Sequence, residues 1–166
     1  MTAPLLIELL GSAHDRAGFS CGVEALDRYF RQQVTQDMRR RATACYVAVE
    51  EAGAKVAGYY TLAAGGIPLS DLPAALAKKL PRHPSVPVAR MGRLAVDHAY
   101  RGRKLGAALL WDVGWRCLRS EVAVFALVVD AKDEQAERFY RHHGFVPFGN
   151  QPRQLVLPLA TFAAGA

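Results

Sequence analysis

Residues 93–106 constrain the fold of this chain more than any other stretch, because they read as a strand, a turn and a helix in succession. Leu94, Ala95 and Val96 have the apolar character of a strand end, and a short basic turn that contains glycine follows them. Beyond the turn, small and apolar residues recur at spacings of three and four, as on one face of an amphipathic helix. These residues are Gly106, Leu109, Leu110, Val113 and Cys117.

The turn between the predicted strand and helix is a candidate anion site. The first N–H groups of a helix have no intrahelical partner, and the positive end of the helix dipole lies beside them. Arg101, Arg103 and Lys104 add three cations at this point. We therefore expect a ligand with several negative charges, such as a pyrophosphate.

The segments on either side of this turn predict a parallel βαβ unit. Residues 122–129 form an almost unbroken apolar run, which is typical of a strand buried on both faces of a parallel sheet. Residues 91–129 then read as strand, crossover helix and strand, and such a unit is right-handed.

The remaining segments predict a mixed α/β fold. Upstream we expect a strand at residues 5–9, helical residues 23–41, a hairpin of strands at 44–50 and 56–62, a break at 65–68 and a short helix at 70–80. Downstream we expect a helix at 133–143 that Gly144 ends, and final strands at Phe145 and residues 155–159. A length of 166 residues indicates one domain, residues 1–166.

Composition narrows the classes of function. Twenty-one Lys and Arg against fifteen Asp and Glu give a net charge of +6 and a pI near 9.5, which favours polyanionic partners. The three cysteines and five histidines are scattered, so neither a disulfide framework nor a metal site is expected. The sequence has no export signal or membrane-spanning run, and we expect a cytoplasmic protein without a membrane partner. It also lacks the phosphate-binding, hydrolase, metalloprotease and dinucleotide motifs of other enzyme classes.

Residues 101–106 resemble the acetyl-coenzyme A loop of the GNAT family of N-acetyltransferases. That loop reads Arg or Gln, two variable residues, Gly, one variable residue, then Gly or Ala. Lys104 stands where the family usually has glycine, and we expect it to adopt ordinary helical φ/ψ angles and to add a charge beside the pyrophosphate. The resemblance implies a GNAT fold, a single mixed central sheet with a parallel βαβ core. It also implies coenzyme contacts from the strand residues Leu94, Ala95 and Val96 and from the loop residues Arg101, Gly102, Arg103, Lys104, Leu105, Gly106 and Ala107. A backbone N–H of the strand would polarise the thioester carbonyl.

A second block, residues 133–145, matches the same family. The family carries a helix with Asn, two residues, Ala, then Phe-Tyr and a terminal Gly-Phe; Ala136, Phe139 and Tyr140 match, Gly144 and Phe145 follow, and Asp133 takes the Asn position. A tyrosine on such a helix face is more often a core residue. The resemblance instead implies that Tyr140 is the general acid that protonates the departing coenzyme thiolate, and that Asp133, Ala136 and Phe139 line the coenzyme.

No residue is marked as the general base for the attacking amine. Glu50, Glu51, Asp97, His98 and Glu137 are candidates, and each reads equally well as a solvated or capping residue. An α-amino group titrates near pH 8, roughly, so positioning a neutral amine is a sufficient alternative.

A narrower resemblance extends from about residue 14 to residue 159. Segments such as 19–22, 56–62 and 92–97 are similar to the TacT and AtaT type of acetyltransferase toxin in bacterial toxin–antitoxin pairs. The resemblance implies acetylation of the α-amino group of aminoacyl-tRNA, which blocks translation. It also implies a ribbon-helix-helix antitoxin as partner, operator DNA bound through that antitoxin with a repressor role, and a homodimer.

Basic clusters are candidates for binding tRNA phosphates. They are Arg39, Arg40, Arg41, Lys78, Lys79, Arg82, Arg90 and Arg93. A solvated surface is the alternative, and for residues 39–41 the two are evenly balanced. Two other functions stay open: acetylation of a small amine or a protein N-terminus, and a non-catalytic module that joins antitoxin and operator DNA.

Overall fold

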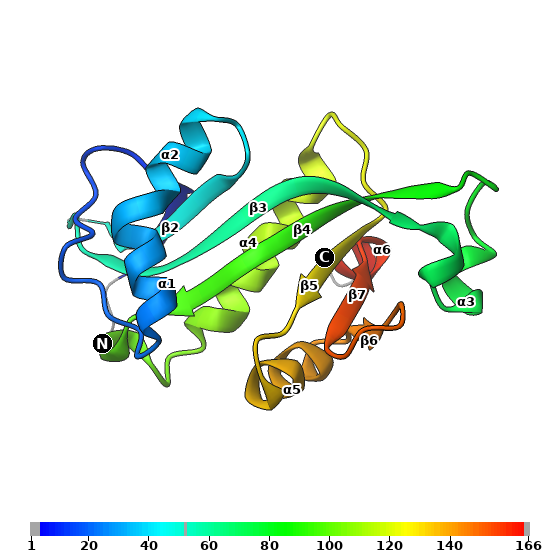
Figure 1. Ribbon diagram of the computed structural model, residues 1–166. Helices are drawn as coiled ribbons and strands as arrows, with labels where there is room; N and C mark the ends of the chain where they lie inside the picture. Colours follow the sequence, from blue (N-terminus) through cyan, green and yellow to red (C-terminus); the bar gives the residue numbers. More distant parts are fainter. Residues whose placement is uncertain (1–3, 52, 165–166) are drawn as a thin grey trace. The chain divides into compact units, whose positions relative to one another are not determined.

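The computed structural model describes residues 4–51 and 53–164, and in this part of the chain seven strands form one mixed sheet with helices around it (Figure 1). The strands lie in the order β1-β2-β3-β4-β5-β7-β6. Their bounds are β1 Leu5–Leu9, β2 Ala44–Glu50, β3 Val56–Pro68, β4 Ser85–Val96, β5 Ala126–Asp130, β6 Val146–Pro147 and β7 Gln154–Pro158. The predicted α/β class with a single mixed sheet is confirmed.

The helices are shorter and more interrupted than the sequence predicts before residue 100, and agree closely with it afterwards. The α-helices are α1 Glu24–Arg28, α2 Val34–Arg39, α3 Ala74–Ala77, α4 Leu105–Arg119, α5 Glu134–His142 and α6 Ala160–Ala164. A π-helical turn, Tyr29–Gln33, joins α1 to α2, and 3₁₀ turns occupy Leu69–Asp71 and His98–Tyr100. No helix in the described part of the chain is long and apolar enough to cross a membrane.

The predicted βαβ unit is confirmed by β4, α4 and β5. Strands β4 and β5 are parallel and pair Val88 with Ala126, Ala89 with Leu127 and Arg90 with Val128. The crossover through α4 is what allows two strands to run parallel. The predicted start of the second strand is wrong, because β5 begins at Ala126 and the side chain of Val122 is 71% exposed.

The predicted break at residues 65–68 is also wrong. Strand β3 continues through both glycines to Pro68. A Cβ atom on Gly66 would lie only 2.7 Å from Ser85 Oγ, so the absence of a side chain permits a close approach that a turn signal does not reveal. The predicted helix at 70–80 is reduced to α3, because Pro73 interrupts the segment and precedes a new helix start.

The chain divides into two compact units, and a single domain over residues 1–166 stays a prediction. The first unit contains the described residues up to Ala63 together with Gly92–Val113. In it, helices α1 and α2 pack on one face of the sheet, where the rings of Phe30 and Tyr59 stack with centroids 4.3 Å apart. The first turns of α4 pack on the opposite face, where the Tyr60 hydroxyl donates a hydrogen bond to Asp112 at 2.7 Å.

The second unit contains Ala64–Met91 and the described residues from Gly114 onwards. Its core combines side chains of β3, β4, β5 and β7 with those around α3. On α4, Gly114 lies directly against the ring of Phe162 from α6. The close contact explains why a glycine stands inside a long helix.

Candidate active site

In the first unit, a 3₁₀ turn capped by Asp97 connects β4 to residues 101–104, the predicted anion-binding turn. Asp97 follows the strand, and its Oδ1 accepts a hydrogen bond from the Ala99 N–H at 2.9 Å. Tyr100 is buried, and its hydroxyl donates to Glu50 Oε1 at 2.7 Å. Residues 101–104 are exposed, and α4 begins directly after them.

The N-terminus of α4 presents the unpaired amides that the sequence predicts. The first intrahelical bond found at this end runs from the Ala108 N–H to the Lys104 carbonyl at 3.1 Å, so the preceding amides lack an intrahelical acceptor. Leu105 is buried, and a Cβ atom on Gly58 of β3 would lie 3.3 Å from its side chain. The first residue of the helix therefore packs against β3. Such an end suits the phosphates of a coenzyme.

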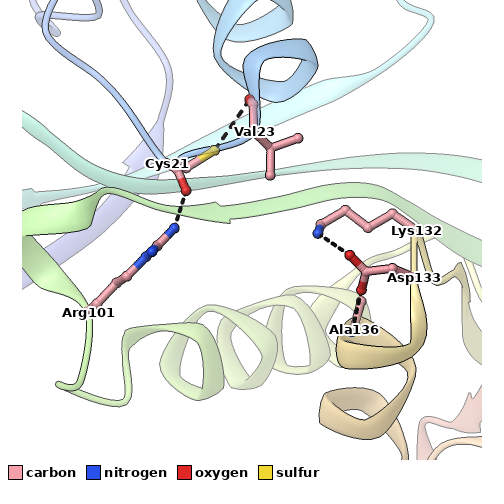
Figure 2. A network of polar contacts seen from close by, with 6 residues as sticks. All are labelled: Cys21, Val23, Arg101, Lys132, Asp133 and Ala136. Carbon is pink, nitrogen blue, oxygen red and sulfur yellow. Dashed lines mark hydrogen bonds and ion pairs between the residues drawn. The ribbon is translucent and has the colours of Figure 1, made fainter.

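A segment far upstream anchors the turn. The Arg101 guanidinium donates a hydrogen bond to the Cys21 carbonyl, as Figure 2 shows. The Ser20 N–H donates to Asp97 Oδ2 at 3.0 Å, and the His98 N–H donates to the Ser20 carbonyl at 3.0 Å. The sequence alone indicates no role for residues 20–22, because hydrogen bonds of backbone groups do not depend on residue type.

The backbone conformation of Lys104 differs from the one expected from the sequence. Its φ angle is +60°, in the left-handed region, and not the ordinary helical value expected from the sequence. The chain leaves the turn and enters α4 at this residue, and the reversal needs a conformation that glycine adopts at little cost. The left-handed backbone at this position explains why the family usually has glycine there. Lysine keeps that backbone conformation here and adds an exposed ammonium group.

The predicted strand residues lie where β4 ends. Ala95 is buried, whereas Leu94 and Val96 are half-buried. The Asp97 N–H donates to the Ala57 carbonyl of β3 at 2.8 Å, which fixes the chain just beyond them. Coenzyme contacts from Leu94, Ala95 and Val96 stay a prediction.

The acidic candidates for a general base are mostly engaged in structural contacts. Buried Asp97 accepts hydrogen bonds from two backbone amides, those of Ser20 and Ala99. Glu50 accepts from Tyr100, and this hydrogen bond raises the pKa of the Tyr100 phenol. Glu137 accepts from Arg141 at 3.1 Å. Glu51 and His98 are exposed.

In the second unit, Asp133 starts α5 as an N-cap. Its Oδ1 accepts from the Ala136 N–H at 2.8 Å, and its Oδ2 pairs with Lys132 Nζ at 2.8 Å (Figure 2). The hydrogen bonds from Lys132 and from Ala136 hold the pKa of the Asp133 carboxyl below its usual value. Gly144, with φ +98°, follows the helix and supplies the left-handed residue that often ends one.

Tyr140 projects from α5 into an aromatic cluster. Its ring meets Phe139 and Phe145 edge-on, with centroids 5.2 and 5.3 Å apart. The residue is 8% exposed, and burial raises the pKa of its phenol above the ordinary value, so the group stays protonated at neutral pH. Among the described residues its hydroxyl has no hydrogen-bond partner, yet no fully buried side-chain oxygen or nitrogen there is left unpaired. The hydroxyl therefore reaches the surface, and a proton is available to a ligand.

Two of the predicted tRNA-binding arginines make contacts within the protein. The Arg93 guanidinium lies 3.3 Å from the centroid of the Tyr29 ring, and the Tyr29 hydroxyl donates to Asp37 at 2.7 Å. Arg90 pairs with Asp130 at 3.1 Å. The remaining candidates, Arg39, Arg40, Arg41, Lys78, Lys79 and Arg82, are exposed. Among the described residues no cluster of three or more His, Cys, Asp or Glu is arranged to hold a metal ion.

The family is shown by comparison with known proteins. Residues 41–147 match the model of the acetyltransferase (GNAT) domain. The chain belongs to the GNAT acetyltransferase family, and it is an N-acetyltransferase that takes its acetyl group from acetyl-coenzyme A.

Two of the relatives carry toxin names. A probable toxin TacT from Sinorhizobium fredii is 29% identical over 89% of this chain and 87% of its own length. A tRNA-acetylating toxin from Mycobacterium tuberculosis is 32% identical over 89% of this chain and 88% of its own length.

Several solved structures have the same fold as this chain. AtaT in complex with acetyl-methionyl-tRNAfMet has a TM-score of 0.87 at 29% identity and covers 97% of this chain and 98% of its own. AtaTR bound with acetyl-coenzyme A has a TM-score of 0.81 at 27% identity and covers 96% of each chain. The KacTA–DNA complex has a TM-score of 0.79 at 25% identity and covers 97% of each chain.

Proposed function

We propose that this chain is a toxin that acetylates the α-amino group of the amino acid on charged tRNA and thereby stops translation in the cytoplasm. The proposal rests on the similarity of this GNAT acetyltransferase to toxins that act on tRNA. One relative is a tRNA-acetylating toxin, and one similar protein, AtaT, was solved with an acetylated aminoacyl-tRNA. An acetylated amine can no longer attack the next peptidyl ester, so a small chemical change has a large effect on the cell.

The phosphate loop, residues 101–104 with the start of α4, would hold the acetyl donor. The amides at the start of α4, which have no intrahelical acceptor, and the cations of residues 101–104 would bind the coenzyme pyrophosphate. No other atom lies within 4 Å of where a Cβ on Gly102 would be, so the turn has room for a ligand. The bound coenzyme would supply a reactive acetyl thioester, and backbone groups of Leu94, Ala95 and Val96 would orient it.

Tyr140 would act as the general acid. The free, protonated phenol holds the proton that the coenzyme sulfur takes up when the carbon–sulfur bond breaks. The new carbon–nitrogen bond forms from the neutral amine, whose own proton passes to solvent, and solvent then reprotonates Tyr140. No residue is required to remove a proton first, in keeping with the structural contacts of Asp97 and Glu50.

Exposed cations would bind the tRNA backbone. Arg39 is the last residue of α2 and residues 40 and 41 follow it. Residues 78, 79 and 82 follow α3, and all six side chains are exposed. Phosphate contacts of this kind supply affinity without reading sequence. Arg90 and Arg93 would contribute less than the sequence predicts, because each already has a partner within the protein.

The proposed partners follow from the relatives. KacTA was solved with DNA, and AtaT was solved with the C-terminus of its antitoxin AtaR. We propose that this chain, as a homodimer, is neutralised by a ribbon-helix-helix antitoxin and joins it on operator DNA. The role as co-repressor would accompany the catalytic one.

The test of the proposed function is incubation of the purified protein with labelled acetyl-coenzyme A and total charged tRNA. We expect label on the aminoacyl group, and no label on deacylated tRNA or on free amino acids. Equal labelling of free amines would favour the small-amine activity. Absence of any transfer, with growth arrest retained in cells, would favour the non-catalytic role.

A further inference from the structure

Arg93 of β4 is held in place without using its hydrogen-bond donors. Its guanidinium lies 3.3 Å from the centroid of the Tyr29 ring. Among the residues that the structure describes, no acceptor pairs with its N–H groups, and no side-chain nitrogen there is both fully buried and unpaired. The other half-buried arginines nearby, Arg16 and Arg31, instead donate to backbone carbonyls at 3.0 and 2.7 Å. The donors of Arg93 therefore reach the surface and are available to an anion.

A short chain of hydrogen bonds fixes the ring against which Arg93 packs. The Tyr29 hydroxyl donates to Asp37 Oδ2 at 2.7 Å, and the Gln33 side-chain amide donates to Oδ1 of the same carboxylate at 3.1 Å. These two hydrogen bonds hold the pKa of the Asp37 carboxyl below its usual value. Tyr29 also begins the π-helical turn, and such turns are frequent at functional sites. An arginine that stacks on a fixed ring and keeps its N–H groups available is suited to bind a phosphate through two parallel hydrogen bonds.

Arg93 lies on the face of the sheet opposite the one on which α4 packs. Side chains alternate along a strand, so Arg93 and Ala95 point to the same face of β4. Ala95 and Tyr29 belong to the core cluster beneath α1 and α2, whereas the first turns of α4 pack on the other face. A coenzyme held at the start of α4 would have its phosphates on the α4 side. We therefore expect the anion at Arg93 to come from the acceptor substrate.

We propose that the N–H groups of Arg93 bind the phosphate between the last two nucleotides of the charged tRNA and so position the aminoacyl end for transfer. The inference rests on the proposed function. Arg93 precedes Ala95, where the thioester would lie, by about 7 Å along the strand. Only one ribose and one aminoacyl ester separate this phosphate from the reacting amine, so it is the phosphate that reaches Arg93 while the amine meets the thioester.

The contact with Tyr29 limits how far the Arg93 side chain can extend. Arg93 therefore binds one phosphate at the reacting end and adds little to the overall affinity for the tRNA backbone. Its contribution is to the rate of transfer, because a fixed phosphate limits the positions that the amine can take.

The test uses two small acceptors that differ only in this phosphate. One is 3′-aminoacylamino-3′-deoxyadenosine, in which a stable amide replaces the ester, and the other is its 5′-monophosphate. Both carry the aminoacyl group that the wild-type protein labels on total charged tRNA. We expect wild-type kcat/KM to be about tenfold higher for the 5′-monophosphate, as for one hydrogen bond between charged groups.

Variants of Arg93 then show whether this side chain recognises the phosphate. With Arg93→Gln the preference for the 5′-monophosphate should fall to about twofold or less. Arg93→Lys keeps the charge and loses the two parallel N–H groups, so it should keep an intermediate preference. Arg28→Gln is the matched control, because it removes an exposed charge next to Tyr29 that pairs only with Glu24 at 3.6 Å among the described residues. It should keep the full preference.

Two further measurements separate recognition of the phosphate from a structural role. Thermal melting verifies the fold of each variant, and calorimetry should find the affinity of Arg93→Gln for acetyl-coenzyme A within about twofold of wild type. Equal losses of kcat/KM on both acceptors would make Arg93 a structural residue and overturn the inference. A matching loss of coenzyme affinity would place Arg93 at the donor and overturn it as well.

The failure of this inference is distinguishable from failure of the proposed function. A wild-type protein that acetylates no charged tRNA contradicts the proposed function, and the inference with it. A wild-type protein that acetylates charged tRNA but uses both small acceptors equally well, or an Arg93→Gln variant that keeps the tenfold preference, contradicts the Arg93 inference alone.

Discussion

The Arg101 guanidinium donates a hydrogen bond to the backbone carbonyl of Cys21, and so joins two segments that lie 80 residues apart in the chain. Gly22, the residue after Cys21, adopts φ +91°. A Cβ atom at position 22 would lie 3.1 Å from the Arg101 guanidinium and 3.0 Å from the His98 ring. The turn at residues 101–104, which we propose binds the coenzyme phosphates, is therefore supported by a backbone turn that glycine fits most easily.

Gly22→Ala tests this anchoring. We expect a loss of about 1–2 kcal/mol in the free energy of unfolding, because alanine disfavours the left-handed conformation and crowds both neighbours. Affinity for acetyl-coenzyme A should fall with it, since the turn at 101–104 loses its support. Denaturant unfolding and calorimetry measure the two effects.

Gly18→Ala is the matched control for that substitution. No other atom lies within 4 Å of where its Cβ would be, and its φ angle lies outside the left-handed region. Stability should stay within about 0.5 kcal/mol of wild type or rise slightly. Equal losses in both variants would show that the loss in Gly22→Ala does not come from crowding of Arg101 and His98.

The sequence predicts those parts of the fold whose residues repeat with a clear period. The apolar spacing of three and four beyond Gly106 identified α4, and the Asp133 start with the Gly144 end identified α5 to within one residue at each end. Strand β1 was predicted with its observed bounds. These elements carry their own local signals, so tertiary contacts did not need to be known.

The failures come from backbone contacts that residue types do not encode. Gly65 and Gly66 look like a turn, yet a close approach to Ser85 explains Gly66 within a continuous strand. Val122 looks like the start of a buried strand, yet it is exposed before β5 begins. At the candidate site, the anchoring by residues 20–22 and the left-handed Lys104 were invisible for the same reason.

Asp133 variants test the N-cap of α5. Asp133→Asn should leave thermal stability nearly unchanged at neutral pH, because asparagine caps helices as well as aspartate and takes the residue type usual in the family. Asp133→Ala should lower it, since the Ala136 N–H loses its acceptor. Parallel melts of the three proteins make the comparison.

The same carboxylate has a predictable pH dependence. The pKa of Asp133 is lowered in the folded protein, chiefly by the hydrogen bond from Lys132 and also by that from Ala136. In the unfolded chain its pKa is about 4. The contribution of Asp133 to stability is therefore present above that pH and is lost as the pH falls through the folded pKa. The stability difference between wild type and Asp133→Ala should therefore narrow in acid. A difference that stays constant from pH 7 to pH 3 would contradict an ionised cap.

Gly114→Ala tests the contact between α4 and α6. A Cβ atom at position 114 would overlap the Phe162 ring, which is 4% exposed, so we expect a destabilisation of about 1–3 kcal/mol despite the better helix propensity of alanine. The double variant with Phe162→Leu should recover part of that loss, because a smaller side chain vacates the space. Additive losses in a denaturant-based double-mutant cycle would show that the two positions are not in contact.

Tyr140→Phe tests the general acid with little risk of unfolding. The hydroxyl has no hydrogen-bond partner among the described residues, and the ring contacts with Phe139 and Phe145 are kept, so the free energy of unfolding should change by less than about 0.5 kcal/mol. Acetyl-coenzyme A affinity should stay within about twofold.

The rate of acetyl transfer should instead fall by roughly 10²–10⁴, the usual contribution of a general acid. Because burial raises the pKa of the phenol, wild-type activity should show no decline from Tyr140 ionisation up to at least about pH 10. Single-turnover transfer measured across that pH range tests both statements. A variant that loses coenzyme binding along with activity would make Tyr140 a structural residue, and a variant with wild-type rates would remove it from the chemistry.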